Sequence, residues 1–229
     1  MAQVDFQRRE VTVRLVYYGP ALSGKTTNLA ALHERLDPSK RGHLLSLDTR
    51  DDRTLYFDLL PITVRSKTGV TVRVKLFTVP GQVIHNHTRR LVLQGCDGIV
   101  FVADSRISET DANNESFANL KHNLREIGID PAGVPIVIQF NKRDLPGIRS
   151  DADLQRIAAR GKEPVFAAVA VRKEGVVETF LGLVSAVWNN LDQKLGLGST
   201  HGVAKDELLG SLAAQLGASS AVADAGGLG

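Results

Sequence analysis

Residues 19–26 read Gly-Pro-Ala-Leu-Ser-Gly-Lys-Thr, which matches the G-x-x-x-x-G-K-[S/T] pattern of a phosphate-binding loop. The two glycines allow the backbone to curl so that its N–H groups converge on an anion. In such a loop Lys25 reaches the β- and γ-phosphates of a nucleotide, and the Thr26 hydroxyl can ligate Mg²⁺. The predicted phosphate contacts are Gly19, Leu22, Ser23, Gly24, Lys25, Thr26 and Thr27.

The segments on either side of this loop follow in the order that it requires. Residues 11–18 are a run of β-branched, aliphatic and aromatic side chains typical of a core strand. In residues 25–36, three leucines recur at helical spacing. A strand, a loop and a helix are therefore predicted in succession, and the N-terminal end of the helix adds its positive dipole to the site.

A second motif indicates which base is bound. Residues 135–140 form an apolar strand that runs directly into Asn141-Lys142-Arg143-Asp144, an N-K-x-D sequence. A guanine ring presents its N1–H and its exocyclic amino group side by side, and one ionised carboxylate accepts from both, whereas adenine has a different edge. We assign this role to Asp144. Asn141 is expected to tie this loop to the phosphate loop, and the stem of Lys142 to lie over the base.

With these two motifs the chain resembles a Ras-like small GTPase, and the resemblance covers residues 5–194. It implies an α/β fold, the Ras-like P-loop NTPase, with a mostly parallel twisted sheet, one antiparallel strand and helices on both faces. We expect the GTPase domain to span residues 1–195 and a flexible C-terminal extension to span residues 196–229. The segments that resemble the MglA family of bacterial small GTPases in particular are residues 17–20, 51–58, 78–82 and 101–105.

One position departs from most Ras-like proteins. Their third motif is D-x-x-G, but Thr78 stands here in place of the aspartate, and this departure is itself a mark of the MglA family. The missing carboxylate normally orients the ligands of Mg²⁺. Asp58 is a candidate replacement. The resemblance still implies Mg²⁺ as a cofactor, held by Thr26 and by Thr54.

The resemblance also implies which residues promote hydrolysis. Gln82 follows Gly81, at the place of the glutamine that orients the attacking water in Ras-like proteins. Arg53 is expected to act as an intrinsic arginine finger, which neutralises charge that develops on the leaving phosphate. Arg89 and Arg90 are alternatives for this role.

Further nucleotide contacts follow from the same resemblance. Thr54 and Gly81 are expected to hold the γ-phosphate, so that its loss frees the loops around residues 50–60 and 79–93. In the last nucleotide motif, the backbone N–H of Ala170 is expected to meet the guanine O6.

The implied function is that of a molecular switch that hydrolyses GTP to GDP and phosphate. The family acts in bacterial cell polarity and in gliding or type IV pilus motility, so the implied partners are a roadblock-domain GTPase-activating protein of the MglB type and polarity or motility effectors. Two alternatives stay open. One is a guanine-nucleotide-binding scaffold in which Thr78 has abolished hydrolysis, and the other is a P-loop kinase, against which the N-K-x-D sequence and the Gly81-Gln82 pair argue.

The composition agrees with this interpretation. The 229 residues are 43% hydrophobic and 23% charged, which is typical of a globular protein. The net charge of +3 comes without a dense run of Lys and Arg, so neither nucleic acid nor a polybasic membrane contact is expected. The sequence has no signal peptide, no apolar run of 18 residues and no C-terminal prenylation motif. We therefore expect a cytoplasmic protein that reaches a membrane or a cell pole only through partners.

Overall fold

A twisted mixed sheet forms the centre of the protein, whose computed structural model describes residues 2–5, 7–37, 43–47, 57–81, 86–198 and 202–218. Within this part of the chain the sheet has eight strands, seven of them in the order β3-β4-β5-β2-β6-β7-β8, and β1 pairs with β2. The strands are β1 (Gln3–Asp5), β2 (Glu10–Tyr18), β3 (Leu45–Leu47), β4 (Phe57–Arg65), β5 (Thr71–Thr78), β6 (Gly98–Asp104), β7 (Ile136–Asn141) and β8 (Val165–Ala167).

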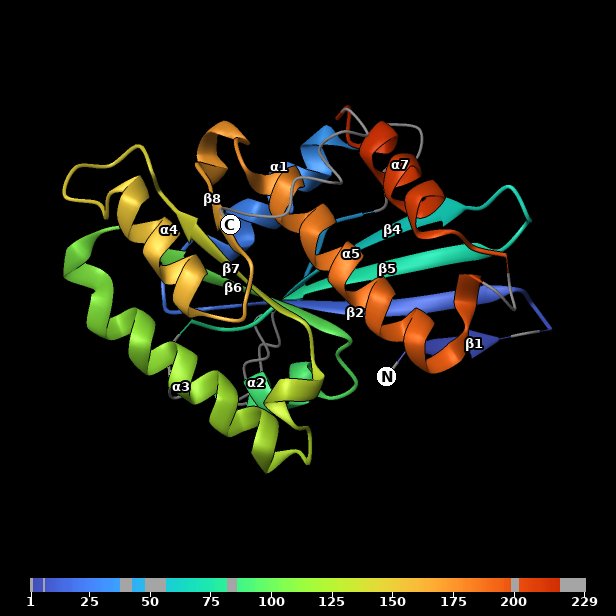
Figure 1. Cartoon of the computed structure of the whole chain (residues 1–229), viewed down its shortest axis with the longest axis horizontal. Helices are drawn as coiled ribbons and strands as arrows, with labels where there is room; N and C mark the ends of the chain where they lie inside the picture. The colour runs from blue at the N-terminus through green and yellow to red at the C-terminus, as the bar shows by residue number, and fades with distance from the viewer. Residues whose placement is uncertain are drawn as a thin grey trace.

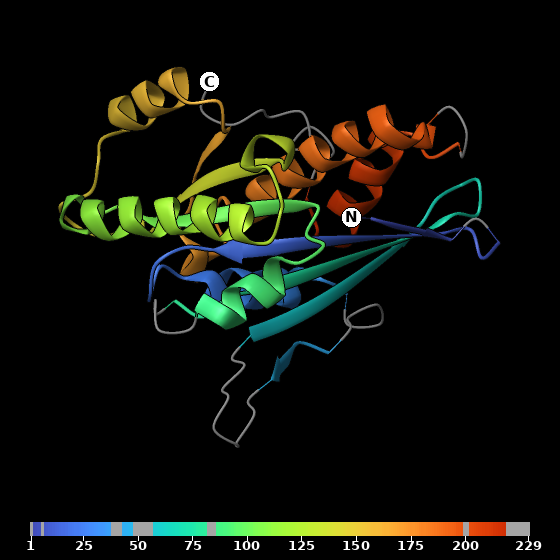
Figure 2. The same ribbon diagram turned by 90° about the horizontal axis from the view of Figure 1, so that it is seen from below.

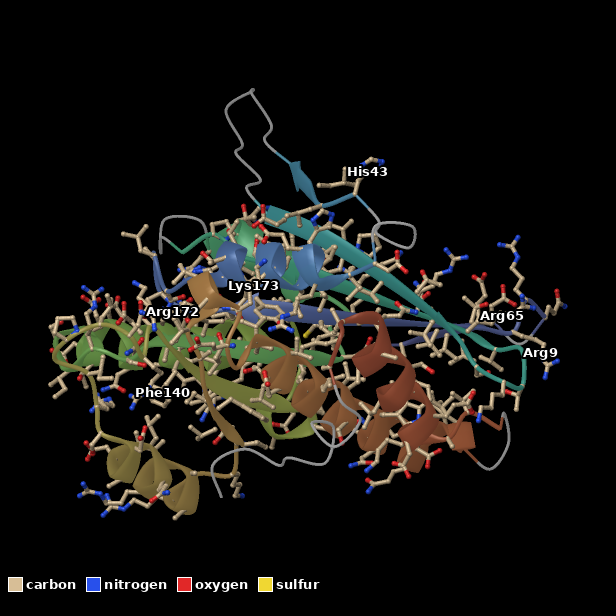
Figure 3. The ribbon with its side chains drawn as sticks, turned by 90° about the horizontal axis from the view of Figure 1, so that it is seen from above. Arg9, His43, Arg65, Phe140, Arg172 and Lys173 are labelled. Carbon is tan, nitrogen blue, oxygen red and sulfur yellow. The ribbon has the colours of Figure 1, made fainter. Side chains whose placement is uncertain are left out.

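The parallel core of the sheet brings the sequence motifs to one edge. Strand β2 pairs in parallel with β5 and β6, and β7 lies in parallel between β6 and β8. The phosphate loop follows β2 and the N-K-x-D sequence begins at the end of β7, so both lie at the carboxyl ends of the strands, where open α/β sheets bind ligands. Arg9 and Arg65 lie at the opposite end of the sheet from Arg172 and Lys173, as Figure 3 shows.

The antiparallel part of the sheet is larger than expected. The predicted antiparallel strand is present as β4, which pairs with β5 along residues 59–65. Two short strands that were not expected to be antiparallel add to it, since β1 pairs with β2 and β3 with β4. Each contributes three residues, so the predicted, mostly parallel Ras-like sheet is retained.

Helices cover both faces of the sheet, as Figures 1 and 2 show. Apolar side chains of α1, α5 and α7 join one buried cluster, and those of α2, α3 and α4 join the other. Helix α4 begins with a capping box, in which the Ser150 side chain accepts from the backbone of Asp153 and the Asp153 carboxylate accepts from the backbone of Ser150. The helices are α1 (Lys25–Arg35), α2 (Asn86–Leu93), α3 (Thr110–Glu126), α4 (Asp151–Arg160), α5 (Val176–Leu195) and α7 (Lys205–Gln215).

The segment after residue 196 corrects one expectation. We predicted a flexible extension over residues 196–229, but its described part packs against α5 and β4. The side chains of Leu208, Leu209 and Leu212 are at most 2% exposed, and Gln215 donates to the Thr63 carbonyl at 3.1 Å. These leucines occupy one face of α7, so burial of that face stabilises a segment that composition alone marked as solvated. None of the described helices has the length and apolar character needed to cross a bilayer.

Candidate nucleotide-binding site

The phosphate loop has a backbone that only glycine accommodates at two positions. Gly19 has φ +147°, and a Cβ there would lie 2.2 Å from the Val102 carbonyl oxygen. Gly24 has φ +100° at the N-cap of α1, and a Cβ there would lie 2.3 Å from Nδ2 of Asn141. The loop therefore packs closely against β6 and the end of β7, which explains the motif's two glycines. Leu22 also has a positive φ of 60°, and its side chain is 88% exposed.

Lys25 is a buried cation at the centre of this loop. Its Nζ donates to the carbonyls of Gly19 and Pro20 at 3.1 and 2.6 Å, and only 7% of the residue is exposed. Burial and, to a smaller extent, the charge of Arg89 together lower the pKa of Lys25 to about 7. Since the ammonium forms no ion pair within the described residues, an anion placed in this loop would stabilise its charged form.

Three oxygen-bearing side chains meet beside the start of α1. The Thr26 hydroxyl donates to Oδ2 of Asp58 at 2.7 Å, and the Thr78 hydroxyl donates to the same oxygen at 3.0 Å. The backbone N–H of Asp58 donates to Thr78 in return at 2.8 Å. Strand β4 thus delivers a carboxylate to the phosphate-loop threonine. The pairing of β4 with β5 brings Asp58 next to Thr78, the position where other Ras-like proteins carry their aspartate.

This donor set fits Mg²⁺. Thr26 offers a hydroxyl and Asp58 a carboxylate, and hard divalent cations prefer oxygen ligands. Among the described residues no three His, Cys, Asp or Glu side chains gather into a site that could hold a metal by itself. Mg²⁺ commonly keeps several waters and uses substrate phosphates besides one or two protein groups, so such a sparse site suits it. Thr54, the other predicted ligand, lies outside the described residues.

We predict that Asp58→Asn raises the Mg²⁺ concentration needed to retain GDP by ~10- to 100-fold, the usual effect of removing a group that supports a metal ligand. The measurement is the rate of release of a fluorescent GDP over a Mg²⁺ titration. In excess EDTA the variant and the wild type are expected to release GDP equally fast. An unchanged Mg²⁺ dependence in Asp58→Asn would show that this carboxylate does not serve the metal.

The guanine loop is braced against the phosphate loop by one side chain. Asn141 donates from Nδ2 to the Ser23 carbonyl at 2.9 Å, and its Oδ1 accepts from the Ala170 N–H at 2.9 Å. The first contact is the tie expected from the sequence. The second contact involves the N–H of Ala170, the group that is expected to meet the guanine O6. Asn141 therefore links the guanine loop both to the phosphate loop and to Ala170.

Asp104 is a residue of the site that sequence analysis missed. It is 3% exposed at the end of β6, and its carboxylate accepts from Nζ of Lys142 at 2.7 Å and from Arg106 at 2.8 Å. Burial raises the pKa of Asp104, but the hydrogen bonds from Arg106 and Lys142 outweigh this effect and lower the pKa to about 2. The backbone of Lys142 is strained, with φ +65°, and Asp104 holds the ammonium group of this lysine. The signal that could have identified Asp104 is the parallel pairing of β6 with β7, which sets Asp104 beside Asn141.

Asp144 keeps its carboxylate accessible. Its side chain is 17% exposed, and its ion pair is a loose one, with Nη2 of Arg172 4.0 Å away. Arg172 and Lys173 lie next to each other after β8, near α1 (Figure 3). Lys173 pairs with Glu34 of α1 at 2.6 Å, which fixes this segment to the helix that follows the phosphate loop.

The second of the two switch loops, around residues 79–93, begins at the end of β5 and is described except for residues 82–85. Gly81 packs so closely on the phosphate loop that a Cβ would lie 2.4 Å from Cα of Ala21. The two alternatives for the arginine finger are both engaged elsewhere. Arg89 is 1% exposed and donates to the Pro80 and Gly81 carbonyls, and Arg90 pairs with Glu126 at 3.6 Å. The principal catalytic candidates, Arg53 and Gln82, lie outside the described residues.

Comparison with known proteins decides the family. No family model matches the chain. The chain is 42% identical over 191 residues to the "Mutual gliding-motility protein MglA" of Myxococcus xanthus (strain DK1622), a match that covers 83% of this chain and 98% of that relative. The chain belongs to the MglA family. It therefore has the Ras-like fold of a family of bacterial small GTPases, and the resemblance inferred from its motifs is confirmed.

Proposed function

We propose that this MglA-family chain is a molecular switch that hydrolyses GTP to GDP and phosphate. The observation that carries the proposal is a hydrogen bond between the two nucleotide motifs. Asn141 of the guanine loop donates it to the Ser23 carbonyl of the phosphate loop. A phosphate subsite and a base subsite are thereby held at a fixed separation, as a guanine nucleotide requires. The same hydrogen bond argues against a P-loop kinase, because a kinase does not need an N-K-x-D loop linked to its phosphate loop.

The phosphate end of the site supplies positive charge in a buried place. The proposed nucleotide contacts there are Lys25 and the backbone of the loop, with Thr54 and Gly81 toward the γ-phosphate. Because the Lys25 ammonium and the loop backbone are held in place before the substrate arrives, we expect them to stabilise the phosphate charge without reorganisation. Thr26, which donates to Asp58, and Thr54 would hold Mg²⁺, and the bound ion would neutralise charge on the phosphate oxygens.

In the proposed reaction, the oxygen of a water molecule forms a bond to the γ-phosphorus while the bond from that phosphorus to the β–γ bridging oxygen breaks. The electrons of the broken bond stay on GDP, and the water protons are released to the phosphate or to solvent. Gln82 orients the water and Arg53 neutralises charge on the leaving group. Asp58 supplies the carboxylate that Thr78 lacks, which removes the main reason to prefer a scaffold that cannot hydrolyse GTP.

We predict that Gln82→Ala and Arg53→Ala each lower activator-stimulated GTP hydrolysis by ~10²-fold or more, while GTP affinity changes by only a small factor. Both groups act mainly in the transition state, and contacts made only there change turnover but not binding. The measurement is single-turnover phosphate release with a saturating roadblock-domain activator. Thr54→Ala is the comparison, since loss of a γ-phosphate contact should weaken the GTP-bound state itself. Wild-type turnover in Arg53→Ala would place the finger in the activator.

The biological part of the proposal follows the family. The relative from Myxococcus xanthus is named for gliding motility, and we propose a role for this chain in cell polarity and in gliding or type IV pilus motility. Its proposed partners are a roadblock-domain activator of the MglB type and polarity or motility effectors. We propose a cytoplasmic protein that reaches a cell pole through these partners, and a boundary near residue 195 between the GTPase domain and the C-terminal segment.

A further inference from the structure

Arg89 of α2 is a buried cation that donates hydrogen bonds to uncharged acceptors. Its guanidinium donates to the carbonyls of Pro80 and Gly81 at 2.9 and 2.6 Å, to Oδ1 of Asn119 at 2.7 Å and to the Tyr18 hydroxyl at 3.4 Å. Only 1% of the residue is exposed, and it forms no ion pair with a carboxylate in the part of the chain that the structure describes. Burial of such a charge is costly unless its donors are satisfied.

The partners of Arg89 belong to three different elements around the site. Tyr18 ends β2 and directly precedes the phosphate loop, and the Arg89 guanidinium lies 5.3 Å from the centre of its ring. Asn119 lies on α3, where Asn123 donates to both Asn119 and the Tyr18 hydroxyl at 3.0 Å. Pro80 and Gly81 follow β5. One planar guanidinium therefore joins the switch backbone to β2 and to α3.

The carbonyl that Arg89 holds belongs to a residue with little freedom to move. Gly81 touches Ala21 of the phosphate loop, and its carbonyl is fixed from the other side by Nη2 of Arg89. Gly81 is also one peptide bond from Gln82. A shift of the Gly81 peptide would therefore move both the proposed γ-phosphate contact and the start of the segment that carries Gln82.

We propose that Arg89 is a positioning residue, whose guanidinium holds the Pro80-Gly81 backbone against the phosphate loop and thereby favours GTP over GDP. The inference rests on the proposed function, because it concerns the γ-phosphate contact of that site. The planar guanidinium is essential to it, since it reaches four acceptors on three different elements at once. The flexible ammonium of a lysine offers no such fixed geometry.

The test compares the affinities of wild type, Arg89→Gln and Arg89→Lys for GDP and for GTPγS. We expect both variants to lower the ratio of GTPγS to GDP affinity by about tenfold or more, the range of a lost hydrogen bond from a charged group. GDP affinity is expected to stay within about threefold, because GDP makes no γ-phosphate contact. Arg73→Gln, at an arginine paired with Glu10, is the control and should leave the ratio unchanged.

Asn119→Ala keeps the test decisive if the arginine variants do not fold. It leaves Arg89 in place but removes its acceptor on α3, and the affinity ratio should fall in the same direction. A merely structural role would lower the affinities for GDP and GTPγS equally, and that result would overturn the inference, as would an unchanged ratio. A wild-type protein that binds neither nucleotide would instead overturn the proposed function.

Discussion

Asp144→Asn is expected to lower GDP affinity by a factor on the order of 10⁴, the discrimination reached when a site built to hydrogen-bond a ligand meets the wrong edge. The carboxylate accepts from two adjacent guanine donors, and the amide places its own donor opposite one of them. A buried donor that loses its acceptor keeps its full desolvation cost. Xanthine carries a carbonyl where guanine carries the amino group, so the same variant should gain affinity for xanthosine diphosphate.

The measurement is displacement of a labelled GDP or a labelled xanthosine diphosphate by unlabelled nucleotides. Asp151→Asn is the matched control, because it makes the same chemical change at a carboxylate whose side chain is 78% exposed and pairs with Arg143. It should leave the preference for guanine intact. If ATP and GTP displaced GDP from the wild type equally well, Asp144 would have no part in reading the base.

Lys25→Ala is expected to lower the affinity for GDP and GTP by ~10²- to 10³-fold. Breaking a buried charge pair by removal of one partner typically costs about 3–5 kcal/mol. Here the phosphates would lose the buried ammonium of the loop, which the structure holds beneath the carbonyls of Gly19 and Pro20. The fold should survive. Alanine loses the hydrogen bonds of the ammonium, but it also removes the unfavourable free energy of burying a charge at this site.

The measurement for Lys25→Ala is nucleotide affinity by calorimetry, together with circular dichroism as a check on the fold. Lys121→Ala is the control, because Lys121 lies on α3 and pairs with Glu163 away from the site. It should bind GDP as the wild type does. Wild-type GDP affinity in Lys25→Ala would mean that residues 19–26 do not cradle phosphates.

Much of this site was predictable because short motifs lie at strand ends. The phosphate loop follows the β-branched run of β2, and the N-K-x-D sequence follows β7, so a parallel sheet must bring both to one edge. The tie from Asn141 to the phosphate loop was expected for the same reason. Local spacing carries such information well, because each motif is contained within one loop.

The contacts that were missed join residues far apart in the chain. Asp58 was named as a candidate replacement for the absent aspartate, but its contact with Thr26 depends on the antiparallel pairing of β4 with β5, a register that no local pattern encodes. Asp104 required the pairing of β6 with β7, and Arg89 required the approach of α2 to α3. The packing of α7 was missed for a different reason. Leu208, Leu209 and Leu212 have amphipathic spacing in the sequence, but the Gly-, Ala- and Ser-rich residues that follow them favoured a solvated extension.

The central claim is tested most directly by phosphate release from GTP by the purified wild-type chain, in Mg²⁺, with and without a roadblock-domain activator, and with ATP in parallel. The proposed switch should release phosphate slowly from GTP alone, at least ~10²-fold faster with the activator, and not measurably from ATP. Tight GTP binding without any release of phosphate in either condition would contradict hydrolysis and leave a guanine-nucleotide-binding scaffold.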